Sequence, residues 1–560
     1  MLFGALLIGF FCQTMNGYDS MLLGGLLNNK EYFLEHFNGQ NKGIWAGLIS
    51  SMHQIGGVSA LPFAGPACDQ WGRRIGMFIG SVIIVIGVII QGLTSTNGSE
   101  SQFMGGRFLI GFGVTIAAAA GPIWVVETAH PRYRGVITGL CNTTWLVGAI
   151  LASGATRGGL DLKNNTSWLL PTWLQLFFPG FIILGAFLIP ESPRWLYANG
   201  KREASLNTLT KWHGNGNRDS AWVHLQITEY EANIELDGSD KRWWDYRGLF
   251  NKRSSIYRVA VACWFSAFSQ WCGNGVLSYF IGAVLDTVGV NDSIAKANVQ
   301  LGFSVVQFVC AVIGAHFVEL FGRRKMMLAG FFGCSLVWVC MTASAGTLAS
   351  SWVSGTVKDG DAVYSNDSAA NAVLGFIFIF AAVYSFNITP LQSLYPVECI
   401  SFEIRAKGMA FQSAFVNAAG LLNQFAWPIA IEKIEWRTYI IFVVWCSIQG
   451  VVAYFFFPET RKRTVSQISS TSLNSTDSHY SLRNSMPSSR LPTQSSSPSP
   501  PTRLPSTRTR PSLLSMRMPL PSSVKHLAKM TRSVAHNNRN IGVKRVQTAA
   551  RQGCDPCLIW

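Results

Sequence analysis

The chain has 560 residues, of which 49% are hydrophobic and only 13% charged, and its net charge is +16. Because soluble domains carry about 25% charged residues, this composition argues against a soluble protein and indicates a membrane protein. The sequence shows no nucleophile motif, metal-ligand cluster or phosphate-binding loop. We therefore expect no enzyme, no cofactor, no metal site and no nucleic-acid partner.

Apolar runs recur along the chain. About 20 predominantly apolar residues suffice for a helix that crosses a bilayer. The sequence predicts twelve such spans, at about residues 2–27, 44–66, 75–93, 103–126, 136–155, 171–189, 256–281, 299–321, 326–349, 370–397, 407–431 and 437–457. Twelve spans place both chain ends on one side of the membrane.

The first span contains a carboxylate, Asp19, between two apolar stretches. A charge deep in a spanning helix costs roughly 2.5–3.5 kcal/mol, so it is expected to have a partner or a function. The arginine in a comparable position is Arg107, in the fourth span. Burial favours the neutral acid and a guanidinium favours the anion, so Asp19 is a candidate proton switch with Arg107. The alternative is a structural salt bridge between the two helices.

The loops indicate the orientation, because basic residues concentrate on the cytosolic side. Arginine and lysine follow the second, fourth, eighth, tenth and twelfth spans, at 73–74, 132–134, 323–325, 405–407 and 461–463. This predicts that both termini are cytosolic. The glycosylation sequons fall in the opposite loops, at Asn97, Asn164, Asn165, Asn291 and Asn366.

The long polar connection at residues 190–255 separates a first group of six spans, 1–189, from a second, 256–463. Its composition suggests short amphipathic helices. The end of the chain, 464–560, is rich in Ser, Pro and Arg, and we expect a disordered, basic cytosolic tail. The alternative is that the tail is an artefact of the gene model. Because the chain begins almost at the first span, we also expect that its start is truncated.

The two groups of spans repeat three landmarks in the same order. These are GPACDQWGRR at Gly65 and GAHFVELFGRR at Gly314, ETAHPRYRG at Glu127 and ECISFEIRAKG at Glu398, and PESPR at Pro190 and PETRK at Pro458. Matched landmarks indicate a duplicated six-helix unit. Duplicated bundles are typical of transporters, with the substrate site between the halves near the membrane midplane.

The repeated landmarks carry acids and arginines at helix ends, which predicts a cytosolic charge network that stabilises one conformation and breaks in another. We expect Glu127 to pair with Arg134 and Glu398 with Arg405. The candidate gate residues are Asp69, Gly72, Arg73, Arg74, Glu127, Arg134, Glu191, Arg194, Glu319, Gly322, Arg323, Arg324, Glu398, Arg405 and Glu459. The alternative is that the arginines only satisfy the charge bias of cytosolic loops.

Nine motifs in register support a family resemblance over about residues 2–464. They are GYD, DQWGRR, GRFLIGFG, ETAHPRYRG, PESPRWL, QWCGNGVLSYF, ELFGRR, YPVECISFEIRAKG and PETRKRT. With these the chain resembles the sugar porters of the major facilitator superfamily, most closely the fungal lactose-permease-type and hexose transporters. The resemblance implies an all-α membrane protein with twelve transmembrane helices in two pseudo-symmetric six-helix bundles.

A sugar site needs amide side chains, which both donate and accept hydrogen bonds, beside aromatic surface. The candidate substrate residues are Gln270, Trp271, Asn274 and Tyr279 in the seventh span, Asn142 in the fifth, Gln307 in the eighth, and Asn417 and Asn423 in the eleventh. The alternative for each amide is a hydrogen bond between helices. Ser269 and Ser393 replace a glutamine and a tryptophan usual in hexose transporters, which suggests a site other than a standard glucose site, such as one for a disaccharide.

The resemblance also implies the coupling mechanism, because proton symporters of this family pair the acid of the first helix with the arginine of the fourth, and passive facilitators lack the acid. We therefore expect a proton-coupled importer of a hexose or of a disaccharide such as lactose, acting as a monomer in the lipid bilayer of the plasma membrane. The alternatives are a passive facilitator and a transporter-like sugar sensor that signals through its tail.

Overall fold

The computed structural model describes residues 2–39, 43–131, 133–237, 247–290, 292–358, 361–364, 366–400 and 405–461. All of them belong to one compact unit, Met1–Ser485, and a second unit, Met486–Trp560, lies outside the described residues. The predicted tail, the sequon at Asn291 and the basic residue Arg132 also lie outside them.

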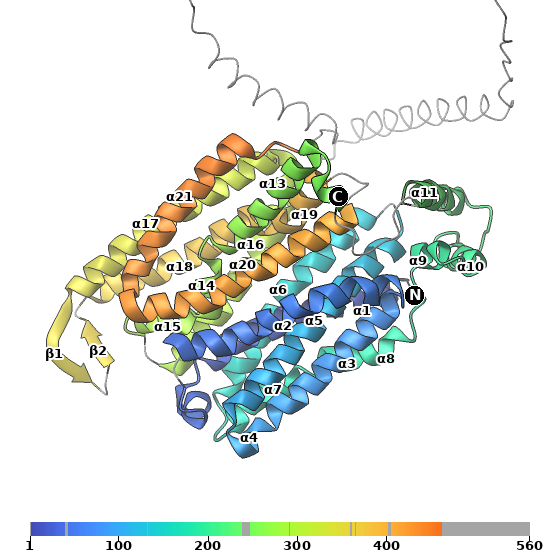
Figure 1. Ribbon diagram of the computed structural model, residues 1–560. Helices are drawn as coiled ribbons and strands as arrows, with labels where there is room; N and C mark the ends of the chain where they lie inside the picture. Colours follow the sequence, from blue (N-terminus) through green and yellow to red (C-terminus); the bar gives the residue numbers. More distant parts are fainter. Residues whose placement is uncertain are drawn as a thin grey trace, which may run out of the picture. The chain divides into compact units, whose positions relative to one another are not determined.

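The N-terminal half contains the first six predicted spans as helices (Figure 1). They are α1 (Leu2–Leu26), α2 (Gly43–Asp69), α3 (Arg73–Gly92), α5 (Glu100–Thr128), α6 (Arg134–Gly159) and, as one span in two pieces, α7 (Thr166–Leu174) and α8 (Phe177–Ala186). A short π-helix, η1 (Lys30–Leu34), follows α1, and α4 (Thr94–Asn97) follows α3.

Four shorter helices connect the halves: α9 (Pro193–Ala198), α10 (Arg202–Trp212), α11 (Ala221–Asp237) and α12 (Arg247–Phe250). Tyr197, Leu209, Val223 and Tyr230 form a small apolar core among α9, α10 and α11. His213, just after α10, lies with its Nε2 atom 2.9 Å from the carbonyl oxygen of Thr128 at the end of α5. This contact fixes the connecting helices to the N-terminal half.

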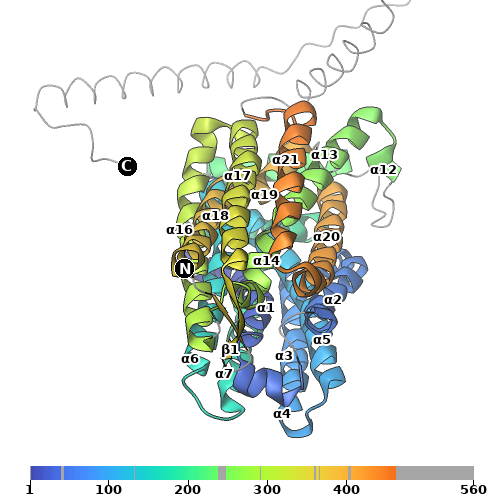
Figure 2. The same cartoon turned by 90° about the vertical axis from the view of Figure 1, so that its left-hand side faces the viewer.

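The C-terminal half repeats the pattern (Figure 2). Its helices are α13 (Arg253–Gln270), α14 (Asn274–Tyr279), α15 (Ile281–Asp286), α16 (Ser293–Phe321), α17 (Arg323–Ser350), α18 (Asp367–Asn387), α19 (Thr389–Cys399), α20 (Arg405–Ile434), the 3-10 helix η3 (Glu435–Arg437) and α21 (Thr438–Phe456). A two-stranded antiparallel hairpin, β1 (Trp352–Lys358) and β2 (Asp361–Tyr364), lies between α17 and α18.

The seventh span is broken, although the sequence predicts one continuous helix over 256–281. Helix α13 ends at Gln270 and α14 begins at Asn274, because Gly273 adopts the left-handed conformation with φ of 97°. A Cβ atom there would lie 2.4 Å from the ring of Trp338, so only glycine fits. The indole N–H of Trp338 donates to the freed carbonyl of Cys272 at 2.9 Å, which satisfies the interrupted backbone.

The tenth span is broken as well. Helix α18 ends at Asn387, and Pro390 lies in the first turn of the following helix, α19. Proline has no N–H to donate to the preceding turn and its ring crowds that turn, so a single straight helix over 370–397 cannot form.

Eight helical runs in the described part of the chain are long and apolar enough to cross a membrane. They cover the predicted spans three to six and eight to twelve. The other three predicted spans, α1, α2 and α13 to α15, are helical too, and they contribute to the contact between the two halves.

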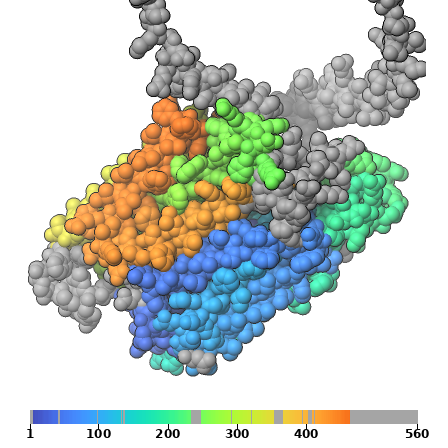
Figure 3. Space-filling model, in the orientation of Figure 1, coloured from blue at the N-terminus to red at the C-terminus, as the bar shows by residue number. Residues whose placement is uncertain are grey.

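The two halves contact each other through α2 against α20, α6 against α16, and α1 against α14. Figure 3 shows the first of these seams, where the orange surface of α20 borders the blue surface of α2. We call the end of the helices that carries Asn97 and Asn366 the sequon end, and the end that carries Gly72 and Gly322 the Gly-Arg-Arg end.

Polar contacts join the halves near the sequon end. Asn28 Nδ2 donates to Gln300 Oε1 at 2.8 Å, and Arg157 Nε donates to Asn298 Oδ1 at 2.8 Å. Asp286 lies between two lysines: Lys30 Nζ of the N-terminal half is 3.2 Å from its carboxylate, and Lys296, whose side chain is fully buried, also pairs with it. A buried ammonium needs such a partner, because its desolvation is otherwise uncompensated.

We expect Asp286→Asn to destabilise the protein by about 3–5 kcal/mol, because it leaves the ammonium of Lys296 buried without its counter-charge. The melting temperature of the purified protein in detergent measures the effect. Asp161→Asn is the matched control, because Asp161 pairs with Arg157 while 60% exposed, and exposed pairs contribute under about 1 kcal/mol. Equal melting temperatures for the two variants would contradict the importance of this lysine pair.

Candidate functional site

The carboxyl group of Asp19 lies in the core of the N-terminal half, where the side chain is fully buried. Arg107, on α5, is also buried, and its Nη1 atom donates to the backbone carbonyl oxygen of Asp19 at 3.1 Å. Among the described residues, neither carboxylate oxygen of Asp19 has a hydrogen-bond partner, and neither has Arg107 Nε. The structure therefore brings the two residues together but joins them through the backbone of Asp19 rather than through the predicted ion pair.

A small cavity lies next to this pair at the interface of the halves. Its volume is about 10 Å³, close to the space that one water molecule needs. It is lined by Ser20, Leu23, Gly24, Ser50, His53, Gln54, Arg107, Tyr279 and Gln424. The first seven residues come from α1, α2 and α5, and the last two from α14 and α20, so both bundles contribute to it. In this conformation the cavity is too small for a sugar.

Two of the predicted substrate residues contact each other. Gln307 Nε2, on α16, donates to Asn274 Oδ1, on α14, at 2.9 Å. Ser278 Oγ donates to the same oxygen at 3.2 Å. The break at Gly273 makes this possible, because it starts a new helix at Asn274 and turns that side chain toward α16. The pair presents neutral amide groups of the kind that recognise hydroxyl groups.

The remaining predicted substrate residues also lie in the interior. Asn423 Nδ2 donates to the backbone oxygen of Gln270 at 2.7 Å, and its Oδ1 atom accepts from Trp427 at 2.8 Å. Trp271 Nε1 donates to the carbonyl of Ala419 at 3.2 Å. Asn417 Nδ2 donates to Ser413, one turn earlier on its own helix, at 3.0 Å.

The other three predicted substrate residues are Tyr279, Gln270 and Asn142. Tyr279 lines the cavity beside Arg107. The side chains of Gln270 and Asn142 are partly buried on α13 and α6. The hydrogen bonds of Asn423 and Trp271 described above connect α20 with the broken seventh span. Both residues therefore stabilise the packing of these helices, independently of any contact with substrate.

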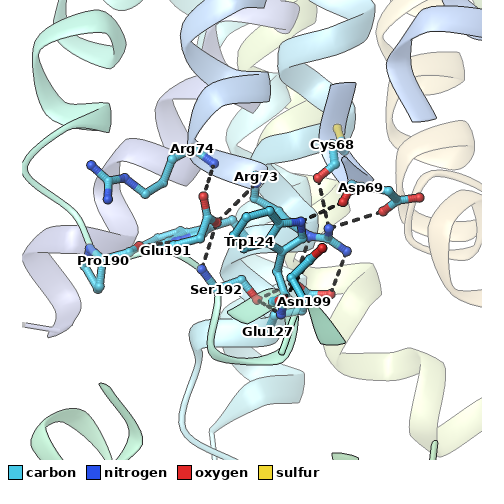
Figure 4. A network of polar contacts seen from close by, with 11 residues as sticks. Cys68, Asp69, Arg73, Arg74, Trp124, Glu127, Pro190, Glu191, Ser192 and Asn199 are labelled. Carbon is cyan, nitrogen blue, oxygen red and sulfur yellow. Dashed lines mark hydrogen bonds and ion pairs between the residues drawn. The ribbon is translucent and has the colours of Figure 1, made fainter. Parts of the chain in front are cut away.

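The candidate gate residues of the N-terminal half form a network at the Gly-Arg-Arg end (Figure 4). The guanidinium of Arg73 forms a bidentate pair with Glu127, with Nε–Oε2 and Nη2–Oε1 distances of 3.0 and 3.3 Å. Asp69 lies 3.2 Å from the same guanidinium. Glu191 accepts from the backbone N–H groups of Arg73 and Arg74 at 3.2 and 3.3 Å, so its carboxylate caps the N-terminus of α3.

The burial of Glu191 affects its protonation. Burial raises the pKa of this carboxyl above its ordinary value, and the backbone N–H groups of Ser192 and Arg74, which stabilise the anion, oppose the rise. Arg74 itself donates to the carbonyls of Ala186 and Phe187 at the end of α8, at 2.7 and 3.0 Å. The network therefore connects the second, third and fourth spans with the sixth.

The C-terminal half contains counterparts of the bidentate pair and of the carboxylate cap. Arg323 forms a bidentate pair with Glu398 at 3.1 and 2.8 Å, and Glu459 accepts from the backbone N–H groups of Arg323 and Arg324 at 3.0 Å each. Smaller contacts repeat as well. The hydroxyls of Ser192 and Thr460 donate to Glu127 and Glu398, and Trp124 and Tyr395 donate to the carbonyls of Pro190 and Pro458. The duplication visible in the sequence is thus a structural pseudo-symmetry.

Gly72 and Gly322 make these caps possible. Both are in the left-handed region, with φ of 104° and 88°. A Cβ atom would lie 2.5 Å from Glu191 Oε2 at Gly72 and 3.0 Å from Glu459 Oε2 at Gly322. The glycine of each Gly-Arg-Arg sequence is therefore required both by its backbone conformation and by the close approach of the capping carboxylate.

Two expected pairings differ from those in the structure. Glu127 pairs with Arg73, and Arg134 Nη1 lies 3.9 Å from Glu229 of α11 instead. Glu398 pairs with Arg323, and the side chain of its expected partner Arg405 lies outside the described part. Spacing along the chain indicated an i to i+7 pair across a loop, but the arginine at the start of the neighbouring helix is closer in space.

The other gate candidates can be placed as follows. Arg194, on α9, lies near enough to Asp69 to stabilise its charge. Glu319 belongs to α16, and its side chain is not among the described ones. The hydrogen bonds and ion pairs given above for this end all remain within one half, so in this conformation the two networks strengthen the separate bundles.

His53 and Gln54, which line the cavity from α2, were not predicted from the sequence. The signal for them is the polar cluster SSMHQ at residues 50–54, inside an otherwise apolar span. Asn28 and Gln300, which connect the two halves near the sequon end, were not predicted either.

Together, two pseudo-symmetric helical bundles with a polar cavity between them define a membrane transporter of the major facilitator fold. The family model described as "Sugar (and other) transporter" matches residues 5–471. The chain belongs to this family, and it is an integral membrane protein and not an enzyme.

Known proteins similar to the chain are transporters. The "High-affinity glucose transporter" of Kluyveromyces lactis is 27% identical over 482 residues, covering 82% of this chain and 84% of that protein. The "Quinate permease" of Neurospora terricola is 27% identical and covers 81% and 85%.

Among solved structures, the partially occluded inward-open form of the xylose transporter XylE from E. coli has a TM-score of 0.66 at 16% identity, covering 83% of this chain and 99% of that one. At this identity the likeness confirms the fold alone.

We expect Gly72→Ala to destabilise the N-terminal half by about 1–3 kcal/mol, because it introduces left-handed strain and displaces the Glu191 carboxylate from the start of α3. Thermal stability of the detergent-solubilised protein, followed by size-exclusion chromatography, measures the effect. Gly65→Ala, in the same motif, is the control, because a Cβ atom there meets nothing within 4 Å. A melting temperature for Gly72→Ala as high as that of the control would show that the cap is dispensable.

Proposed function

We propose that this protein is a proton-coupled sugar importer that works by alternating access in the plasma membrane, with both termini in the cytosol. The observation that carries the proposal is the position of the buried Asp19 and Arg107 beside a polar cavity to which both bundles contribute. A titratable carboxyl at this place can connect protonation to the contact between the halves.

Asp19 is the residue to which we assign the proton. A buried carboxylate without a hydrogen-bond partner is costly as an anion, so we assign the neutral acid to the conformation described here. When the proton leaves, the anion can attract the guanidinium of Arg107 from the backbone carbonyl to the carboxylate. Arg107 also lines the cavity, so this movement changes the surface that substrate meets.

A polyhydroxylated ring is the substrate class that these side chains fit best. Asn274, Gln307 and Gln424 are neutral amides that can both donate to and accept from hydroxyl groups, and Trp271 and Tyr279 can cover apolar ring faces. Among the described residues that line the cavity, the cation is Arg107, which is held by Asp19. This favours a neutral sugar over an acid, although the names of relatives include both a glucose transporter and a quinate permease.

The symport mechanism receives further support from a solved structure of the same fold, which is titled a "proton:xylose symporter". The direct test is uptake of radiolabelled mono- and disaccharides by the expressed protein, with proton influx recorded in parallel. Proton influx with one sugar and not with others would identify the substrate. Uptake that is indifferent to pH and moves no protons would instead identify a passive facilitator, and no uptake of any sugar would favour a sensor.

We expect Asp19→Asn to abolish proton influx and sugar accumulation against a gradient, because the amide cannot exchange a proton. Sugar counterflow across membranes with equal pH on both sides should persist, because the amide resembles the neutral acid in shape. Asp161→Asn, which changes an exposed acid, is expected to retain coupled uptake. Accumulation by Asp19→Asn at wild-type levels would rule out Asp19 as the coupling group.

For Gln307→Ala we expect an increase of the KM for sugar of about threefold to tenfold, because a neutral hydrogen bond contributes about 0.5–1.5 kcal/mol. Asn274→Ala should have a similar effect. The double variant should raise the KM by less than the product of the two single increases, because the two residues contact each other. Asn387→Ala is the control, since that amide bonds to its own helix at Val383. An unchanged KM in both single variants would exclude this pair from the substrate site.

A further inference from the structure

The cavity next to Arg107 contains a histidine that the coupling mechanism above does not use. His53, on α2, is 8% exposed, and its Nδ1 atom has no hydrogen-bond partner among the described residues. The cavity has room for about one water molecule. His53 and Arg107 therefore line the same small cavity, and a ring nitrogen of His53 has no donor there among the described residues.

The packing of α2 against α5 fixes this arrangement. Arg107 and Gly111 are four residues apart and lie on the same face of α5. A Cβ atom at Gly111 would lie 1.9 Å from the backbone oxygen of His53, so the two helices are in backbone contact at this point. His53 and Arg107 consequently belong to one tightly packed pair of helices in the same half and keep their relation when the halves move.

The chemistry of the guanidinium requires a second acceptor. Arginine donates up to five hydrogen bonds, accepts none and stays charged, and a buried charge without a partner is strongly destabilising. When Asp19 is neutral, Arg107 loses its counter-ion. Among the described side-chain atoms that are buried and have no hydrogen-bond partner, the lining of this cavity contributes two acceptors, Nδ1 of His53 and Oε1 of Gln424. Gln424 belongs to the other half and is withdrawn when the halves part, whereas His53 is not.

We propose that neutral His53 becomes the acceptor for the Arg107 guanidinium when the halves part while Asp19 carries the proton, so that the proton switch has three members. This inference rests on the proposed proton coupling. Around the described cavity the titratable groups are Arg107 from α5 and Tyr279 from α14, with Asp19 of α1 bonded to Arg107. Helix α20 contributes the neutral Gln424. Beside the guanidinium His53 stays uncharged, and the proton is carried by Asp19.

The test is the pH dependence of sugar uptake and of proton influx. His53→Leu removes the acceptor, so protonation of Asp19 becomes less favourable and the pH of half-maximal uptake should fall by about one unit, equivalent to a tenfold weaker proton affinity. His53→Gln keeps an acceptor, so its pH of half-maximal uptake should lie close to that of the wild type. His224→Leu, at an exposed position of α11, is the control and should have the wild-type profile.

Counterflow at fixed pH confirms that each variant is folded, and His53→Met replaces His53→Leu if the latter fails to accumulate. A wild-type profile in the variant without an acceptor, or the same shift in His53→Gln as in His53→Leu, overturns the role of His53. If the wild type itself moves no protons, the proposed symport fails first. If Asp19→Asn is uncoupled and His53→Leu has a wild-type profile, only the present inference fails.

Discussion

A buried guanidinium cannot lose its charge and must keep hydrogen-bond acceptors, and this constraint organises the centre of the protein. Arg107 is only 2% exposed and lies where α1, α2 and α5 pack together. Its Nη1 atom donates to the backbone carbonyl of Asp19, and polar side chains of both halves line the cavity beside it. Any change of protonation at Asp19 therefore changes what Arg107 can bond to, and the nearest alternatives lie at the interface that alternating access must open.

The Gly-Arg-Arg end of each bundle follows a different rule, because the charges there are paired within each half. Glu191 and Glu459 cap α3 and α17, and the bidentate pairs of Arg73 with Glu127 and Arg323 with Glu398 connect neighbouring helix ends. The contacts between halves that the structure describes, such as Asn28 with Gln300, lie near the other end. Each bundle can therefore remain rigid while the seam between them changes.

The sequence predicted the twelve helical spans, the duplication and the family, because apolar runs, repeated landmarks and the nine motifs carry that information. It also identified Asn274 and Gln307 as candidate substrate residues, and the structure places them in contact. It failed at the helix breaks, since Gly273 and Pro390 lie in apolar runs that match a continuous helix. The partner of Glu127 was wrong because the spatial neighbour, Arg73, starts another helix 54 residues earlier.

His53 was not predicted from the sequence for a related reason. A single histidine in an apolar span has no periodicity or spacing that indicates a ligand, and its position against Arg107 depends on the backbone contact of α2 with α5 at Gly111. Tertiary packing of this kind leaves no local pattern in the sequence.

The two capping carboxylates have a consequence for the order in which the protein is made. Glu191 and Glu459 each follow the last span of their half, and each completes a network that begins at the start of that half's third helix. During synthesis the first network cannot close before α8 has left the ribosome, and the second cannot close before α21 has. The third helix of each half thus acquires its capping carboxylate only after the sixth span has been made, whereas the arginine–glutamate pairs need no residue of that span.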